Sequence, residues 1–179
     1  MKIDWKNIGI KELAAIVSAK LNEKGIDAIL AGGACVSIYT KNKYLSSDLD
    51  FVSASSVKEI SPVLSELGFE RKSSRHFEKK GCPFFIEFVP SPAAIGSEPI
   101  KGKNILKTRM GYITLLTPTD SVKDRLAAYY HWNDPQALEQ ALMLAKAQKI
   151  NLREIKRWSE KEGHKEKYNV FIRMMKGRK

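Results

Sequence analysis

Long apolar runs are missing from this 179-residue sequence, and cysteine is scarce. No stretch approaches the roughly 18 to 20 apolar residues that span a bilayer, so we expect no membrane segment. The first residues, MKIDWKNIGI, lack the continuous apolar core of a signal peptide, and we expect a cytoplasmic protein. The two cysteines, Cys35 and Cys82, have no ligand-like spacing, so the sequence implies neither a disulfide framework nor a cysteine-based zinc site.

Acidic residues are also in the minority. The chain has 20 Asp and Glu against 31 Lys and Arg, which gives a net charge of +11. A surplus of this size attracts polyanions such as nucleic acids or nucleotides. More than half of it lies in residues 151–179, where basic side chains exceed acidic ones by six. A solvated basic face that keeps the protein soluble would have the same composition, so both interpretations stay open.

The N-terminal part of the chain alternates between helical and strand patterns. Ser56 and Glu59 form a capping-box pattern for a helix that ends near Leu67. Pro62 is expected near the first turn of this helix or at a point where the helix restarts. A hairpin is expected around the turn Gly81-Cys82-Pro83. The other expectations are a helix over 10–24, strands over 26–31 and 48–52, a short helix over 34–40, hairpin strands within 69–80 and 83–89, an irregular excursion over 90–104, and a last strand over 112–116.

From Pro118 onward the apolar period becomes helical. Asp134 before Pro135 is a typical helix start, and Asn151 with Glu154 forms a second capping-box pattern. Gly163 is expected to end that helix and to precede a terminal one. The chain therefore divides into an α/β part, residues 1–117, and a helical region, residues 118–179, which is an α+β (α/β) fold class with a mixed sheet.

The pair Asp48 and Asp50 is the first candidate for chemistry. Two carboxylates two positions apart on a strand project from the same face, a few ångströms from each other. Their repulsion is relieved when a divalent cation binds between them, and hard oxygen ligands suit Mg²⁺ or Mn²⁺. A solvated strand edge would show the same pattern, so the pair alone does not decide.

Glu87 lies within PFFIEFV, an otherwise apolar strand. An unpaired carboxylate there is destabilising unless it faces a partner or a cavity. If this strand lies beside that of Asp48 and Asp50, the three carboxylates converge in an arrangement that can hold metal ions around a transferring phosphoryl group. The alternative is an edge glutamate that faces water or pairs with Arg75 or Lys79.

The glycines Gly32 and Gly33 end one expected strand and open a helix. Backbone N–H groups at such a helix start can approach a phosphate closely, because glycine has no Cβ in the way. A glycine pair is also an ordinary tight turn. Its position, fifteen residues before Asp48, adds weight to the functional interpretation.

Four other features have competing interpretations. Lys123, Asp124 and Arg125 are either functional or a solvated helix face. His76 and His131 have no second ligand at metal-binding spacing, so we expect surface or capping roles. Trp132 and Trp158 are expected to pack between helices, with base stacking as the alternative. Cys35 is expected to be buried.

The segment LAGGACVSIYTKNKYLSSDLDFV resembles the signature of the DNA polymerase β-like nucleotidyltransferase superfamily. The tail SVKDRLAAYYHWNDPQALEQALMLAKA resembles small prokaryotic members grouped with AbiEii-type toxins and other minimal nucleotidyltransferases. The resemblance implies a nucleotidyltransferase-type mixed sheet flanked by helices. Tyr44, where the family often has a basic residue, and Gly33, where many groups have Ser, depart from the pattern and leave the nucleotide and the acceptor open.

By this resemblance, Asp48, Asp50 and Glu87 would be the catalytic residues and would hold Mg²⁺ or Mn²⁺. The triphosphate of an NTP would contact the residues Gly32, Gly33, Ser46, Ser47 and Lys123. The expected reaction transfers an NMP to an acceptor hydroxyl, for which the basic charge favours RNA, including tRNA. An antitoxin or other partner protein is expected if the enzyme is a toxin.

Two other functions are compatible with these residues. The first is a catalytically weak member that binds nucleic acid or a partner protein through its basic helices. The second is an antibiotic nucleotidyltransferase acting on an aminoglycoside, which should have an acidic acceptor groove and is disfavoured by the Lys and Arg of the helical region.

Overall fold

A computed structural model describes residues 3–90 and 94–177 of the chain. Among these residues, no helix is long and apolar enough to cross a membrane. The helices are α1 (Ile10–Glu23), α2 (Gly32–Tyr39), α3 (Val57–Glu66), α4 (Pro118–Trp132), α5 (Pro135–Ala147), α6 (Leu152–Lys161) and α7 (Lys165–Gly177). The strands are β1 (Ile29–Ala31), β2 (Asp48–Ser53), β3 (Glu70–Arg71), β4 (His76–Glu78), β5 (Phe85–Pro90), β6 (Ala94–Ile95), β7 (Glu98–Pro99), β8 (Lys103–Thr108) and β9 (Gly111–Leu116).

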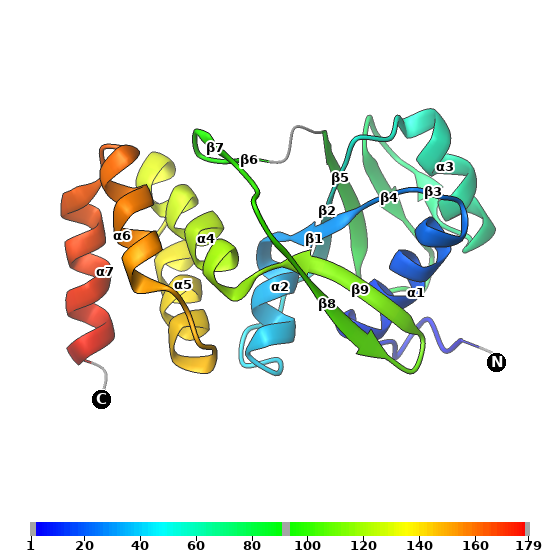
Figure 1. Ribbon diagram of the computed structural model, residues 1–179. Helices are drawn as coiled ribbons and strands as arrows, with labels where there is room; N and C mark the ends of the chain where they lie inside the picture. The colour runs from blue at the N-terminus through cyan, green and yellow to red at the C-terminus, as the bar shows by residue number, and fades with distance from the viewer. Residues whose placement is uncertain (1–2, 91–93, 178–179) are drawn as a thin grey trace.

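Seven of the strands form one mixed sheet in the order β3-β4-β5-β2-β1-β9-β8 (Figure 1). β2 runs parallel to β5, and β1 runs parallel to β9, while the other neighbours in this sheet are antiparallel. The expected α+β class with a mixed sheet flanked by helices is confirmed.

The two faces of the sheet differ because strand side chains alternate. On the first face, which we call the covered face, Leu49 and Phe51 of β2 lie level with Ile86 and Phe88 of β5, and all four are buried. α1 packs along β9 at this face, so closely that a Cβ at Gly111 would lie 3.0 Å from the Cβ of Ala19. The opposite face, which we call the open face, bears Asp48, Asp50, Val52, Phe85, Glu87 and Val89.

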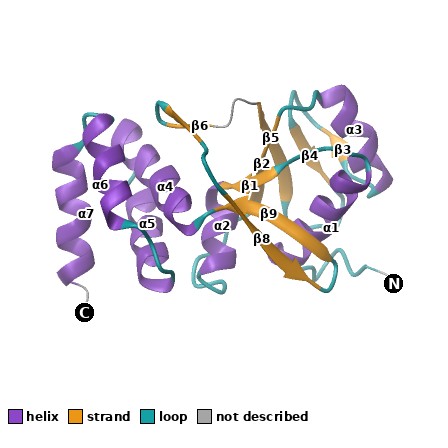
Figure 2. Ribbon diagram, viewed as in Figure 1, coloured by secondary structure: helices purple, strands orange, loops and turns teal. Residues whose placement is uncertain are grey.

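The helical region follows β9 directly and lies to one side of the sheet (Figures 1 and 2). α4 begins at Pro118 with the Thr117 hydroxyl as its cap, and α5 begins at Pro135 with the Asp134 carboxylate capping two N–H groups. α6 begins after Asn151, whose side chain accepts from the Glu154 N–H. These starts confirm the helix start expected at 134–135 and the N-cap at Asn151. The capping box expected at 151–154 is only half formed, because the Asn151 N–H donates to the Thr119 hydroxyl and the Glu154 carboxylate accepts from Lys123. The division into domains 1–117 and 118–179 remains a prediction.

Three expectations about local structure were wrong. The strand expected within 69–80 is two short strands, β3 and β4, that pair with each other. Pro62 lies inside α3, beyond its first turn, and the helix continues past it. Part of the stretch expected to be irregular forms the small β6–β7 pair and the start of β8, while its residues 91–93 lie outside the described residues. β8 exists because β9 supplies a hydrogen-bonding partner, and its own sequence alternates only weakly.

Phe51 offers a test of the packing beneath the site. Its ring is buried and stacks on Phe88 at a centroid distance of 5.7 Å. We expect Phe51→Ala to lower the free energy of unfolding by about 3 to 5 kcal/mol, because it leaves a cavity in the core. Val89→Ala, in the neighbouring strand but 46% exposed, should cost less than about 1 kcal/mol. Urea denaturation measures both, and equal losses would contradict the assignment of faces.

Candidate active site

The pairing of β2 with β5 brings the predicted carboxylates to one edge of the open face. Asp48 and Asp50 project from the same face of β2. In the parallel register Asp50 lies level with Glu87, and on its other side Asp50 lies level with Ala31. Directly opposed residues in neighbouring strands share a face, so Asp50 and Glu87 are adjacent on the open face. The condition that the sequence analysis set for a three-carboxylate site, neighbouring strands, is met.

Gly32 and Gly33 lie against this edge, at the first turn of α2. Gly32 has a φ of +64°, in the region that favours glycine, and a Cβ there would collide with the carboxylate of Asp50. A Cβ at Gly33 would lie 2.7 Å from the hydroxyl oxygen of Ser46. The two glycines therefore let the start of α2, with its free N–H groups, approach the aspartates.

Ser46 connects the loop before β2 to the first aspartate. Its hydroxyl donates to Asp48 Oδ1 at 2.6 Å, and its own N–H donates to the Ser37 hydroxyl of α2 at 3.0 Å. Ser47 is exposed, and its carbonyl accepts from the Phe85 N–H at 3.3 Å. The structure thus brings Ser46 and Ser47 together with Asp48 and the glycine turn.

Glu87 has a partner that the sequence analysis did not foresee. Glu87 Oε1 and His76 Nδ1 are 2.8 Å apart, and the other ring nitrogen of His76 is 2.8 Å from Glu78 Oε1. Hydrogen bonds first to Glu87 and then to Glu78 raise the pKa of His76, which favours the imidazolium. The proposed partners of Glu87 were Arg75 and Lys79, and the ammonium of Lys79 lies instead over the ring of Trp5 at 4.6 Å. His76 lies level with Glu87 because β4 pairs with β5 in this register. The contact could be predicted from the sequence only if that pairing were known.

Asp50 is the most perturbed carboxylate of the group. Burial, followed by the charge of Asp48, raises its pKa to about 7, while the charge of Arg125 acts in the opposite direction. The guanidinium of Arg125, on α4, is held by the Asp124 carboxylate at 2.6 Å and by the Gln140 amide oxygen at 3.3 Å. The sequence is compatible with a functional or a solvated Arg125; in the fold its side chain is 19% exposed, and its charge acts on Asp50.

The carboxylate oxygens at this edge of the sheet are partly suited to bind a divalent cation. Asp48 and Asp50 are hard oxygen donors on one face, and burial, followed by the charge of Asp48, raises the pKa of Asp50. In the described part of the chain, however, no group of three or more His, Cys, Asp or Glu side chains has the geometry to hold a metal ion. One oxygen of Glu87 is hydrogen-bonded to His76, and one oxygen of Asp48 accepts from Ser46.

Lys123 lies in a different set of contacts. Its ammonium is 2.7 Å from Glu154 of α6 and 3.6 Å from Asp120, and the residue is 5% exposed. Together with Lys101 and Asn151 it lines a pocket of about 370 Å³ at the start of α4. Among the described residues its ion pairs are with those two carboxylates, so its contacts do not join it to Asp48 and Asp50.

The remaining candidates are placed individually. Trp158 is fully buried, as expected, and its ring stacks on Tyr130. Trp132 was expected to pack, but it is 80% exposed because it ends α4, beyond the contacts with α5 and α6. Cys35 is buried as expected, and burial raises the pKa of its thiol to about 12, which disfavours the thiolate.

The comparisons with known proteins concern the fold. No family model and no curated protein matches the sequence. An antigenic nucleotidyltransferase-like protein from Paracoccidioides brasiliensis matches with a TM-score of 0.58 at 14% identity, over 76% of this chain and 75% of that one. The crystal structure of ANT(2'')-Ia in complex with adenylyl-2''-tobramycin matches with a TM-score of 0.51 at 12% identity, over 94% of this chain and 97% of that one.

A solution structure of the antibiotic-resistance factor ANT(2'')-Ia matches with a TM-score of 0.52 at 11% identity, over 94% of this chain and 95% of that one. At such identities the similarity shows a common fold. The chain therefore has a nucleotidyltransferase-type fold, the class that the resemblance implied.

Gly32 gives a test of the close approach between α2 and β2. We expect Gly32→Ala to lower the free energy of unfolding by about 2 to 4 kcal/mol, because the new Cβ adds a collision with Asp50 to the backbone strain. Gly25→Ala is the matched control, since Gly25 has a φ of +70° with nothing within 4 Å of a Cβ. It should show only the strain, about 1 to 2 kcal/mol. Equal losses in thermal or urea unfolding would mean that Asp50 does not face Gly32.

Asp50 gives a test based on pH. Its pKa of about 7 in the folded chain exceeds the ordinary aspartate value of 3.8, so the folded chain binds this proton more tightly than the unfolded chain. The stability contributed by that proton is present at low pH and is lost as pH rises through about 7. In metal-free buffer we expect Asp50→Asn to stabilise the protein by about 2 to 4 kcal/mol near pH 8, and hardly at all near pH 4.

Urea denaturation at the two pH values measures this difference. The matched control is Asp27→Asn, at an exposed aspartate just before β1. It should change the free energy of unfolding by the same amount at both pH values. A variant at position 50 that is destabilised near pH 8 would contradict the electrostatic account.

Proposed function

We propose that this protein is a metal-dependent nucleotidyltransferase, which moves an NMP from an NTP to an acceptor hydroxyl with release of pyrophosphate. One observation supports it above the others: Asp48 and Asp50 lie against the Gly32-Gly33 start of α2, and Glu87 is level with Asp50. An anion site and a set of carboxylates at the same edge are what this reaction requires.

In this proposal the start of α2 binds the triphosphate. N–H groups of the first helical turn have no partner within the helix and bear the positive end of its dipole. Gly32 and Gly33 leave room for phosphate oxygens, and Ser47, which is exposed in the loop before β2, is the serine whose hydroxyl would add a donor, since the Ser46 hydroxyl already donates to Asp48. Lys123 has no part in the proposal as it now stands, since Glu154 and Asp120 balance its charge.

Asp48 and Asp50 would hold Mg²⁺ or Mn²⁺, with Glu87 as the third carboxylate. The metal supplies charge neutralisation at the triphosphate when it is bound. Glu87 is suited to take the proton of the acceptor hydroxyl, because its side chain is 46% exposed on the open face and has one oxygen free of His76. His76 fixes the other oxygen and so orients the carboxylate.

The acceptor is proposed to be RNA, including the 3′ end of a tRNA, because the chain has a net charge of +11. A toxin-type enzyme of the AbiEii kind, with an antitoxin as partner, is the setting that the sequence resemblance suggests. The protein would act in the cytoplasm.

A second function is favoured by a specific observation. The described residues contain no group of three or more His, Cys, Asp or Glu side chains that could hold a metal ion, and one oxygen of Glu87 is hydrogen-bonded to His76. A nucleotidyltransferase-fold protein that binds nucleic acid or a partner protein, with weak or no catalysis, would tolerate this arrangement. The experiment below separates the two.

Transfer of label tests the proposed function. We expect the wild type to label RNA from an α-³²P-labelled NTP in the presence of Mg²⁺ or Mn²⁺. Asp48→Ala and Asp50→Ala should each lower labelling by at least about 100-fold, the scale for losing one group that stabilises a transition state electrostatically. Asp27→Asn is the control and should keep full activity, because this aspartate is exposed and lies before β1.

Each of the four NTPs is supplied separately, with total RNA, total protein or an aminoglycoside as acceptor. Labelling of the aminoglycoside alone would keep nucleotidyl transfer and reject the RNA acceptor. RNA binding without labelling under every nucleotide would reject the enzyme in favour of the binding protein.

A further inference from the structure

The β8–β9 hairpin is a basic segment without acidic residues. Between Pro99 and Thr117 the chain has four basic side chains and no Asp or Glu. Lys103, Lys107 and Arg109 are exposed, and none of them forms an ion pair with any residue in the described ranges. A separate pocket of about 1050 Å³ lies between Lys107 and Arg109 at the tip of the hairpin and Lys11 and Glu12 of α1, the helix that packs on the covered face.

The register of the sheet places these lysines on the same face as the carboxylates. Leu30 of β1 is level with Leu115 of β9, so Ala31 and Leu116 are level too. Leu116 opposes Lys103, and Ala31 opposes Asp50. Lys103 and Asp50 therefore belong to one row across the open face, three strands apart, or roughly 14 Å at the usual strand spacing.

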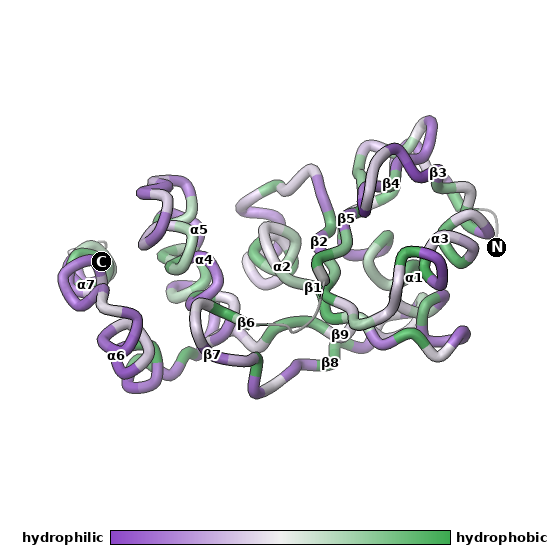
Figure 3. The backbone as a smooth tube through the Cα atoms, turned by 90° about the horizontal axis from the view of Figure 1, so that it is seen from above, coloured by the Kyte–Doolittle hydropathy of each residue, from purple (hydrophilic) through white to green (hydrophobic). Residues whose placement is uncertain are grey.

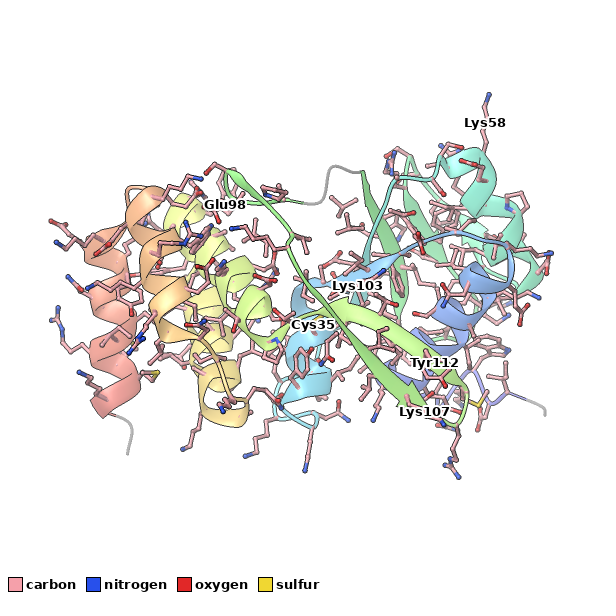
Figure 4. The ribbon with its side chains drawn as sticks, in the orientation of Figure 1. Cys35, Lys58, Glu98, Lys103, Lys107 and Tyr112 are labelled. Atoms are coloured by element: carbon pink, nitrogen blue, oxygen red, sulfur yellow. The ribbon has the colours of Figure 1, made fainter. Side chains whose placement is uncertain are left out.

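Ala31 and Leu116, which lie between them in this row, are buried, whereas the next rows of the open face expose apolar side chains and one aromatic ring. The next row contains Val89, Val52, Ile29, Thr114 and Ile105, all at least partly exposed, with Val89 at 46% and Ile105 at 61%. One row further along the hairpin, Tyr112 is 51% exposed and directly opposes Lys107. Figure 4 shows Lys103 at the start of β8, with Lys107 and Tyr112 near the tip of the hairpin.

Lysines on an edge strand also prevent sheets from pairing edge to edge, so charge alone would not indicate a ligand. That protective role does not require an exposed tyrosine and isoleucine on the same face. Aromatic rings interleaved with cations on an exposed sheet are how proteins bind single-stranded nucleic acid, through base stacking and phosphate contacts.

The C-terminal helices, which hold most of the charge surplus, fit this role less well. Arg157 and Lys161 pair with Glu98 of β7 at 2.6 and 2.9 Å, and Lys167 donates to the carbonyl oxygens of Tyr129 and Tyr130 at the end of α4. These cations hold the helices together. α7 is also the element farthest from the sheet, as Figures 1 and 3 show.

We propose that the open face along β8 and β9 binds a single-stranded RNA acceptor, with Lys103 and Lys107 contacting phosphates and Tyr112 stacking on a base. The inference rests on the proposed function, because the carboxylates define where the end of the strand must lie. It names the hairpin, rather than the basic tail, as the acceptor surface.

Fluorescence anisotropy of a short fluorescein-labelled single-stranded RNA tests this proposal on the full chain. For the double variant Lys103→Ala with Lys107→Ala, we expect the slope of log affinity against log salt to fall by about 1.4, the value for two lost phosphate contacts. For Tyr112→Ala we expect binding to weaken by about 5- to 100-fold with the salt slope unchanged, and for Tyr112→Phe we expect binding near the wild-type level.

The charge-matched control is Lys165→Ala with Arg173→Ala, two exposed residues of α7, which should bind as the wild type does. Loss of binding in that control but not in the hairpin variants would overturn the proposal, as would a wild type that binds no RNA. Light scattering gives a further outcome. If the wild type is a dimer and only the Tyr112→Ala variant is a monomer, the hairpin mediates dimers, and the proposal is overturned. Circular dichroism confirms that each variant is folded.

The readout is separate from catalysis. Hairpin-dependent RNA binding by a wild type that labels nothing would keep this inference and reject the enzyme. If the wild type labels an acceptor but binds no RNA, the enzyme is kept and this inference is rejected.

Discussion

The parallel pairing of β2 with β5 is the interaction on which the candidate site depends. It sets Asp50 level with Glu87, and the same register buries Leu49, Phe51, Ile86 and Phe88 on the covered face. A slip of one residue would move the carboxylates into the core and the apolar side chains into water. The free energy of burying four large side chains therefore also fixes the position of the acidic groups, and a mutation that weakens this core should disturb the site.

The edge of the sheet where the site lies holds an unfavourable buried charge. Asp50 has a pKa raised to about 7 by burial and by Asp48, and Arg125 compensates only in part. A carboxylate perturbed in this way is typical of a binding or catalytic site, because a ligand can relieve the cost of its charge. A divalent cation with a triphosphate would do so, since the cation balances the carboxylates and the phosphates occupy the N–H groups of α2.

The fold decides which of the positive charges in the composition are paired and which are not. Some cations of the C-terminal helices are used in ion pairs, such as Arg157 with Glu98 and Glu154, while Arg153, Lys165 and Arg173 are exposed and have no ion pair within the described ranges. The unpaired cations on the hairpin are fewer, but they share the open face with the carboxylates. For attraction of a polyanion, an uncompensated charge near the site has more effect than a larger number of charges already neutralised by neighbours.

Local pattern determined much of this protein from sequence alone. The α1 helix, the β2 strand with its two aspartates on one face, the capping box at Ser56 and the helix starts at Asp134 and Asn151 depend on neighbours a few residues away, and the structure has them all. Only the tertiary structure decided that His76 holds Glu87, that Lys123 faces Glu154 and that β8 joins the sheet beside β9. These contacts join residues 11, 31 and up to 13 positions apart, and their geometry follows from which strands and helices pack together, a choice made by burial of the whole core rather than by any local pattern.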